Sequence, residues 1–496
     1  MRILILILGL ITSFGGACLA GNHYAYSPLA REAYDKAISL RMKEARQAIA
    51  KLKKQEPGNL VAHHIEDYID FFTIYIGEDA ATMSRLKGNK DRRLSILDDG
   101  PSDSPWHLFI QADIRLHWAL LRFRFGEYIS GFSEVNKAAK LLERNRKLYP
   151  NFMPNQKDLG ILHAAVGTVP DQYKWGLQLL SSLNGTIEQG RKELETVLTY
   201  AERNDFVFRE EARGLYALLL LHLDNKGDEA WDAVNDAALQ PGANPLHCFV
   251  AAHVASRTGR TDKAVALLEK RPVGPQFIAF PFLDYMLGLA KLRRLDKDAA
   301  SHFQRFLSKF RGRHYIKEAY QKIAWSELIN NRPEGYRKNI RYCIQRGLDE
   351  AGGDRSALRE AQSGLAPDIT LLKARLLFDG AYYSQALALL QTKKAGDYKD
   401  KHHRLEYSYR LGRILHGLHR YDEALGYYWQ TVNEGSQERY FFACNAALQM
   451  GLVYEAKGDK KQARNSFNRC LGMEPDEYKT SLHQQAKAGL ARVVKN

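Results

Sequence analysis

The chain has 496 residues, more than one hydrophobic core normally supports, so several cores or a repeating architecture are expected. Tyr (26) and Phe (21) are plentiful, Pro (15) is scarce, and few segments alternate polar and apolar residues as strands do, which argues against an all-β fold. The net charge of +15 comes from short, scattered basic pairs typical of solvated helices, whereas nucleic-acid binding needs clustered cations with stacking aromatics.

Residues 1–20 have the features of an export signal. A short positive start is followed by an apolar run over residues 3–11 and by small residues up to Ala20, so cleavage is predicted before Gly21. The apolar run is too short to span a bilayer of about 30 Å. Lipidation at Cys18 is the alternative, although the leucine usual in a lipobox is missing. We expect a periplasmic or cell-envelope protein, either soluble or associated with a membrane peripherally or through a lipid.

Residues 21–204 are predicted to form an N-terminal helical region with divergent hairpins. Tyr34 and Ile38 indicate a first helix, and the pattern from Ala45 to Leu52 indicates a second one that ends at Pro57. Two longer helices are predicted over residues 106–125 and 129–149, and the outer face of the latter carries Lys and Glu.

A glycine-containing pattern marks residues 100–204, and its key positions are Gly160, Gly167, Pro170, Leu180, Gly185 and Gly190. This segment resembles the inclusion-body clearance family of eukaryotic helical-repeat proteins. The resemblance implies a helical scaffold and no catalytic residue. The alternative is that these glycines only let helices pack closely.

Residues 205–496 repeat one pattern, in which a small residue is followed by Ala twelve positions later and by a large apolar residue sixteen later. It is clearest in two copies, Gly412–Ala424–Tyr428 and Gly451–Ala463–Phe467, with weaker or shortened copies starting at Ala252, Gly288 and Ala374. Two helices packed as a hairpin need a small residue where they approach and a large one to fill the gap. The pattern resembles the tetratricopeptide repeat (TPR) family, which implies an all-α superhelical solenoid of helix hairpins that binds a protein or peptide. We identify eight hairpins, and the C-terminal TPR array is predicted over 205–496.

Catalytic and metal-binding motifs are missing. The adjacent pairs His63-His64 and His402-His403 should point their rings about 100° apart on a helix, so they are predicted to be solvated or interfacial rather than metal ligands. No nucleophile elbow, phosphate loop or dinucleotide fingerprint occurs, so neither an enzyme nor a cofactor is predicted. Four cysteines far apart in sequence are predicted to be buried free thiols: Cys248, Cys343, Cys444 and Cys470.

The first helix of each TPR hairpin lines the concave face of the array, and this register predicts the partner-binding residues. They combine arginines with aromatic residues, as the centres of interfaces do. They are Phe249, His253, Arg257, Tyr285, Arg293, Arg375, Phe378, Tyr409, Arg413 and His416. Three alternatives remain open: packing between repeats at these positions, an envelope-polymer or glycan-binding role in which the aromatics stack on sugars, and an enzyme with an unrecognised site.

Overall fold

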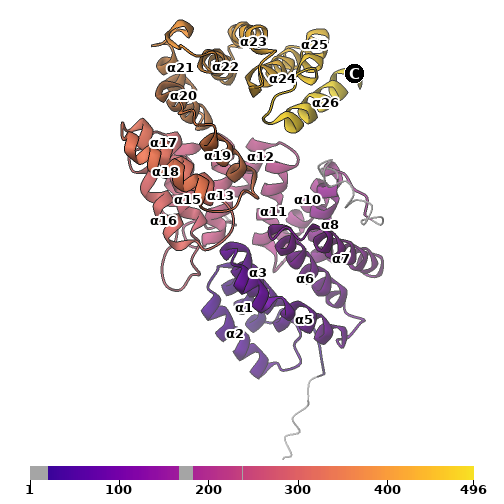
Figure 1. Cartoon of the computed structure of the whole chain (residues 1–496). Helices are drawn as coiled ribbons and strands as arrows, with labels where there is room; N and C mark the ends of the chain where they lie inside the picture. The colour runs from indigo at the N-terminus through magenta and orange to yellow at the C-terminus, as the bar shows by residue number, and fades with distance from the viewer. Residues whose placement is uncertain (1–20, 167–182, 237, 496) are drawn as a thin grey trace, which may run out of the picture.

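The computed structural model describes residues 21–166, 183–236 and 238–495, which form α-helices joined by short loops (Figure 1). Within these residues the only β-type pairing is an isolated bridge between His23 and Asn59. The all-α fold predicted from the sequence is therefore confirmed. The predicted export signal at 1–20, and Gly167, Pro170 and Leu180 of the glycine pattern, lie outside the described residues.

The N-terminal helices share one hydrophobic core, which extends from Ala30 to Ala212. They are α1 (Pro28–Ile38), α2 (Met42–Gln55), α3 (Val61–Gly77), α4 (Ala80–Leu86), α5 (Gly88–Asp98), α6 (Pro105–Arg124), α7 (Tyr128–Leu148), α8 (Met153–Val166) and α10 (Ile187–Arg203). Hairpins are formed by α1 with α2, α6 with α7 and α8 with α10.

The central and C-terminal helices also pack as consecutive hairpins. The central helices are α11 (Arg209–His222), α12 (Gly227–Val234), α13 (Pro245–Arg257), α14 (Thr261–Glu269), α15 (Phe282–Arg293), α16 (Ala299–Lys309), α17 (Ile316–Ile329) and α18 (Pro333–Gln345). The C-terminal helices are α19 (Gly352–Gln362), α20 (Ile369–Asp379), α21 (Tyr383–Leu390), α22 (Lys401–Gly417), α23 (Tyr421–Gly435), α24 (Phe441–Ala456), α25 (Lys460–Leu471) and α26 (Lys479–Lys495). Helix α12 is short, with Asn235 as its C-cap residue.

Close packing of glycine against an aromatic ring holds the hairpins together, as the repeat pattern predicts. A Cβ atom added at Gly451 would lie 2.4 Å from the Phe467 ring, and one at Gly412 would lie 2.6 Å from the Tyr428 ring. In the N-terminal region a Cβ at Gly190 would lie 2.1 Å from the backbone oxygen of Gly160. The close-packing interpretation of these two glycines is thus confirmed.

The first helices of the C-terminal hairpins form an inner layer. Helix α20 packs on α22, α22 on α24 and α24 on α26, whereas no comparable contact joins the second helices α21, α23 and α25, all of which are described. Figure 1 shows α23 and α25 on the outer side of an arch, with α24 and α26 toward the rest of the molecule. The first helices therefore supply the inner face of this arch.

Contacts between distant segments distinguish the chain from a simple stack of repeats. The Glu78 carboxylate at the end of α3 accepts hydrogen bonds from His314, 236 residues further on, and pairs with Arg124 of α6. The backbone N–H of Ile278 donates to the Leu40 carbonyl at 2.9 Å.

The C-terminal arch has two further contacts of this kind. The Thr261 hydroxyl donates to the carbonyl of Gly380 at 2.9 Å, which joins the α13–α14 turn to the α20–α21 turn. Helix α19 reaches the loop before α26, where Arg359 lies 3.6 Å from Glu477. Segments far apart in sequence are thereby held side by side.

Candidate functional site

Residues from three consecutive first helices meet on the inner face of the C-terminal arch. We call Arg375, Phe378, Tyr409, Arg413 and Asn445 the inner stripe. The Arg413 guanidinium of α22 lies 4.9 Å from the centre of the Phe378 ring of α20. Arg413 and Asn445 of α24 each donate a hydrogen bond of 2.8 Å to the Tyr409 hydroxyl. The sequence register predicted four of these residues, and the structure brings them together; Asn445 was not predicted.

The two arginines of the inner stripe differ in their charge partners. Arg375 stacks on Trp325 at 4.7 Å and lies 3.9 Å from Glu360 of α19, so its charge has a counter-ion. Arg413 is half-buried, and no described carboxylate lies within ion-pairing distance of it. Asp379 acts on the Arg413 charge only from beyond ion-pairing distance. A partly desolvated guanidinium with no carboxylate in direct contact favours an incoming one, which it can bind through two parallel hydrogen bonds.

The remaining predicted residues lie on α13, α15 and α22. His416 of α22 is next to the inner stripe, since burial and then the charge of Arg413 lower its pKa to about 4. On α13, Phe249 stacks on His253, and Arg257 is exposed at the end of the helix. Burial and the neighbouring His222, whose Nε2 lies 2.9 Å from Nε2 of His253, lower the pKa of His253 to about 4. His416 pairs with the Tyr428 hydroxyl at 3.3 Å.

Two of the predicted tyrosines are buried. Tyr285 of α15 and Tyr409 are each only 3% exposed, so neither ring face is presented to solvent. Arg293, at the end of α15, is half-buried. The role of each of these residues in binding a partner stays a prediction.

A buried ionic network, which sequence analysis missed, lies in the N-terminal core. Lys157 of α8 is 1% exposed and contacts the carboxylates of Asp113, Asp158 and Glu211 from three helices. His64, at the buried end of the network, bonds to Asp113 at 2.7 Å, so its prediction as a solvated or interfacial residue is wrong. Because these groups are covered by packed side chains and pair with one another, we interpret the network as structural.

Titration in the network follows from its charges. Burial disfavours the Asp113 carboxylate, but Lys157 and His117 outweigh burial and hold its pKa well below the usual range. Asp158 has no such surplus of cations, so burial raises its pKa well above the usual range. Its Oδ2 atom is buried and has no hydrogen-bond partner, while its Oδ1 atom lies 2.7 Å from Nζ of Lys157.

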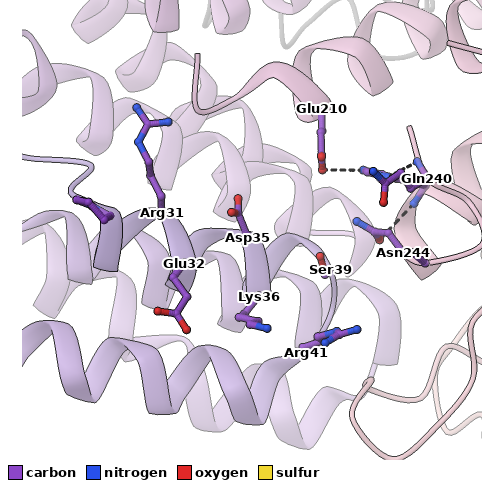
Figure 2. Close-up of a pocket in the computed structure, with 12 residues that line it drawn as sticks. Arg31, Glu32, Asp35, Lys36, Ser39, Arg41, Glu210, Gln240 and Asn244 are labelled. Carbon is purple, nitrogen blue, oxygen red and sulfur yellow. Dashed lines mark hydrogen bonds and ion pairs between the residues drawn. The ribbon is translucent and has the colours of Figure 1, made fainter. Parts of the chain in front are cut away.

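A pocket of about 620 Å³ lies between α1 and the segment that includes Glu210, Gln240 and Asn244. Figure 2 shows Arg31 and Asp35 projecting from α1 on one side and Glu210 on the other. Its lining mixes positively and negatively charged side chains. Sites for organic ligands are instead mainly apolar with a few polar groups. We do not assign it a ligand.

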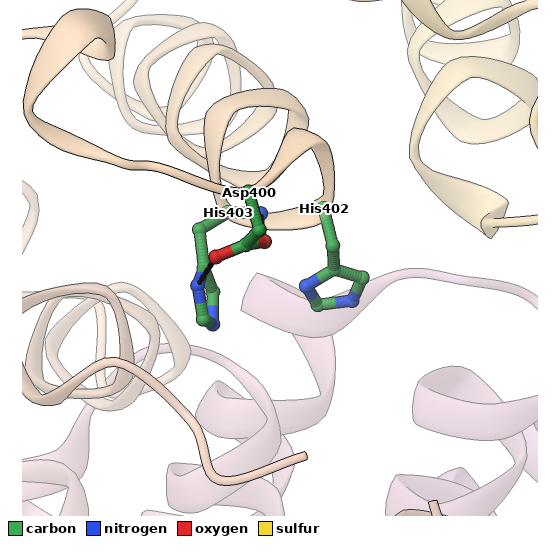
Figure 3. Close-up of side chains that lie close together, drawn as sticks. All are labelled: Asp400, His402 and His403. Carbon is green, nitrogen blue, oxygen red and sulfur yellow. Dashed lines mark hydrogen bonds and ion pairs between the residues drawn. The ribbon is translucent and has the colours of Figure 1, made fainter.

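The second histidine pair also differs from expectation. His402 and His403 do not point apart: together with Asp400 they place ligand atoms within 4.8 Å of one another (Figure 3). All four cysteines are buried and free, as predicted. The Sγ atoms of Cys444 and Cys470 nevertheless lie 3.5 Å apart, a proximity that the sequence did not reveal.

The fold defines the class of the protein as an α-helical solenoid of packed hairpins. Residues 445–477, which include most of α24 and all of α25, match the tetratricopeptide repeat family model, so the chain carries a TPR there. No curated protein sequence matches the chain. Within the described residues, no helix is both long and apolar enough to cross a membrane.

Solved structures of low identity resemble the chain over most of its length. The human IFIT1 dimer with PPP-AAAA is 14% identical, with 89% of this chain and 90% of that chain covered and a TM-score of 0.35. The APC/C hetero-tetramer Cut9–Hcn1 is 12% identical, with 92% and 95% covered and a TM-score of 0.26. At these identities and TM-scores, neither similarity defines an activity or a partner for this chain.

Proposed function

We propose that the chain is an exported scaffold that binds an extended, acidic segment of a protein partner along the inner stripe. The TPR at 445–477 supports a binding role, because such repeats use their first helices to hold protein or peptide partners. The inner stripe lies on the first helices of this TPR and of the two hairpins before it. Export rests on the sequence of residues 1–20 alone.

The observation that carries the proposal is Arg413. It is half-buried on the inner face, rests on Phe378 and lacks a carboxylate partner among the described residues. A glutamate or aspartate of the partner would complete its charge, while a neighbouring apolar side chain would pack beside Phe378. Asn445 and Gln449 lie on the next first helix, where Nδ2 of Asn445 donates to the Tyr409 hydroxyl and Nε2 of Gln449 donates to Oδ1 of Asn445. The second proton of each NH₂ group would donate to the partner's backbone.

Sugar binding is less well supported by the same residues. Stacking on a sugar requires an open aromatic face, but the Phe378 ring is covered by Arg413 and Tyr409 is buried. The face of the inner stripe therefore offers a cation and amides rather than a bare ring. This arrangement suits an acidic peptide.

Peptide binding tests the proposal directly. We would use a fluorescent panel in which each acidic peptide has a counterpart with Gln in place of Glu. Wild type should prefer the acidic member, and Arg413→Glu should lose that preference. The matched control is Arg469→Glu, because Arg469 also stacks on an aromatic ring, at 5.0 Å from Trp429, but on the second helices. Equal weakening by both variants would contradict the proposal, since overall charge would then explain binding.

In-cell crosslinking locates the binding surface. A photo-crosslinking residue at Gln449, on the inner first helix α24, should capture the partner in the native host. The same residue at Gly426 of α23, where a Cβ would meet nothing within 4 Å, should not. N-terminal sequencing of the same material is expected to read from Gly21, and an intact Met1 would exclude export.

A further inference from the structure

The start of α22 gathers two imidazole rings and a carboxylate. Asp400 caps this helix, since its Oδ1 atom accepts a 2.8 Å hydrogen bond from the backbone N–H of His403. Its Oδ2 atom lies 2.5 Å from Nδ1 of His403. Figure 3 shows the rings of His402 and His403 projecting from the same side of the helix, with Asp400 between them. The cap thus fixes one histidine and places the other beside it.

Ring nitrogens in this cluster lack partners. Nδ1 of His402 and Nε2 of His403 are both buried and have no hydrogen-bond partner. The His403 side chain as a whole is 12% exposed. Buried polar atoms are nearly always satisfied, and leaving one unpaired costs roughly 1–3 kcal/mol. Each imidazole of the cluster therefore has a ring nitrogen that a metal ion could bind.

Aromatic side chains surround one of the two imidazoles. His402 packs against the rings of Tyr440 and Phe442, with ring centres 4.6 and 5.2 Å away. The positive end of the α22 dipole opposes a cation, but the carboxylate of Asp400 at the same helix end offsets it.

We propose that Asp400, His402 and His403 form a binding site for a divalent transition-metal ion such as Zn²⁺. Two imidazole nitrogens and one carboxylate oxygen suit Zn²⁺, Co²⁺ or Ni²⁺, whereas Mg²⁺ and Ca²⁺ require oxygen ligands. Tetrahedral ligands of Zn²⁺ are roughly 3.3 Å apart, so donors that already lie within 4.8 Å need only small side-chain rotations. Water would complete the coordination. The bound ion would hold the Asp400 cap and both imidazoles of the first turn of α22 in one arrangement.

Metal titration of the full-length chain without a histidine tag tests this site. After treatment with a chelator, the wild-type chain should bind one equivalent of Zn²⁺. Its midpoint of thermal unfolding should rise when Zn²⁺ binds. Co²⁺ should give the visible absorption of a four-coordinate centre. His402→Ala and Asp400→Asn should each weaken Zn²⁺ binding at least tenfold. Asn caps a helix as well as Asp does, so the latter variant should keep its helicity.

The matched control is the other close histidine pair. His222 and His253 have their Nε2 atoms 2.9 Å apart but no carboxylate in the group, so His222→Ala should leave the Zn²⁺ equivalent intact. Loss of binding in His222→Ala with retention in His402→Ala would overturn the assignment. Failure of wild type to bind Zn²⁺, or to give the Co²⁺ absorption, would overturn it as well.

Discussion

Single buried residues determine much of this molecule's stability. Lys157 is the clearest example, because its buried ammonium group needs carboxylate partners. Its ammonium group is enclosed by three carboxylates and lies 4.9 Å from the Phe208 ring. A buried cation is tolerated only when its partners remain, and the partners depend on it equally. Removing either Lys157 or one of its carboxylate partners should therefore destabilise the other charges of the network.

We predict that Lys157→Met destabilises the chain by about 3–5 kcal/mol at neutral pH, because it removes the ammonium group shared by three carboxyls of the core. In the variant the folded-state pKa of these carboxyls rises above the unfolded value, so the loss should shrink as the pH falls toward that unfolded value near 4. Urea unfolding at several pH values measures this. The control Lys54→Met changes an exposed lysine and should have almost no effect.

Two glycines in helices should respond oppositely to alanine. Gly190→Ala places a methyl group against the Gly160 backbone and is expected to cost about 1–3 kcal/mol. Gly426→Ala adds a methyl where nothing lies within 4 Å, and it should stabilise α23 by about 0.5–1 kcal/mol. Thermal denaturation of both variants checks this. A similar loss in both would contradict the close-approach explanation.

Residues that matter for packing could be predicted from the sequence only where the same spacing occurs more than once. The spacing of Gly451 and Phe467 is visible because the same spacing occurs at Gly412 and Tyr428. Asp113 gave no such signal, because a lone acidic residue in an apolar helix does not reveal which distant lysine will neutralise it. The partners of a buried charge come from other helices, and the spacing of residues along the sequence does not reveal which helices pack together.

At the scale of elements, the hairpins were predicted well, whereas α3–α5, α19 and α26 were not. Helix α3 is buried on nearly all sides, so it shows no polar stripe from which its boundaries could be read. Helix α19 lies outside the repeat register, so the pattern of Gly, Ala and aromatic residues does not include it. The two arginines of the inner stripe were predictable for the opposite reason: Arg375 and Arg413 each directly follow the small residue of their repeat.

Overpacking one hairpin should have a local effect. Ala463 is fully buried in α25, and replacing it with Leu is expected to cost about 1–3 kcal/mol. Because each repeat contacts mainly its neighbours, hydrogen exchange should lose protection chiefly between residues 446 and 482. Unchanged protection in that segment would show that the hairpin register is wrong.

For the whole molecule, the contacts of Glu78 join the first quarter of the chain to its middle. This carboxylate is 2% exposed. Burial opposes its ionisation, but the hydrogen bond from His314 and the charge of Arg124 outweigh burial and hold its pKa below the usual 4.5. The depressed pKa means that this stabilisation is fully present above the unfolded-state pKa and is lost as the pH falls through the folded-state value.

We predict that acid weakens this connection before it unfolds the hairpins. Below about pH 4.3, the unfolded-state pKa of Glu, hydrogen-exchange protection should fall around His314, and Glu78→Gln should show the same loss already at pH 6. The control Glu32→Gln alters an exposed carboxylate and should behave as wild type. Protection near His314 that is the same in Glu78→Gln and wild type at pH 6 would refute this role of Glu78.

The contacts between distant segments also determine how the molecule deforms under load. An uninterrupted stack of repeats is an elastic body whose stiffness is similar along its length, because each unit yields against its neighbours. Here a backbone hydrogen bond joins Leu40 to Ile278. A force that pulls on the two ends of the chain therefore loads this hydrogen bond before it loads the helices between these residues. The arch from α20 to α26 is restrained at its far end by single exposed contacts such as Arg359 with Glu477. Moving the loop before α26 away from α19 would therefore break an ion pair near the surface, whereas separating residue 278 from the α1–α2 turn would break a backbone hydrogen bond.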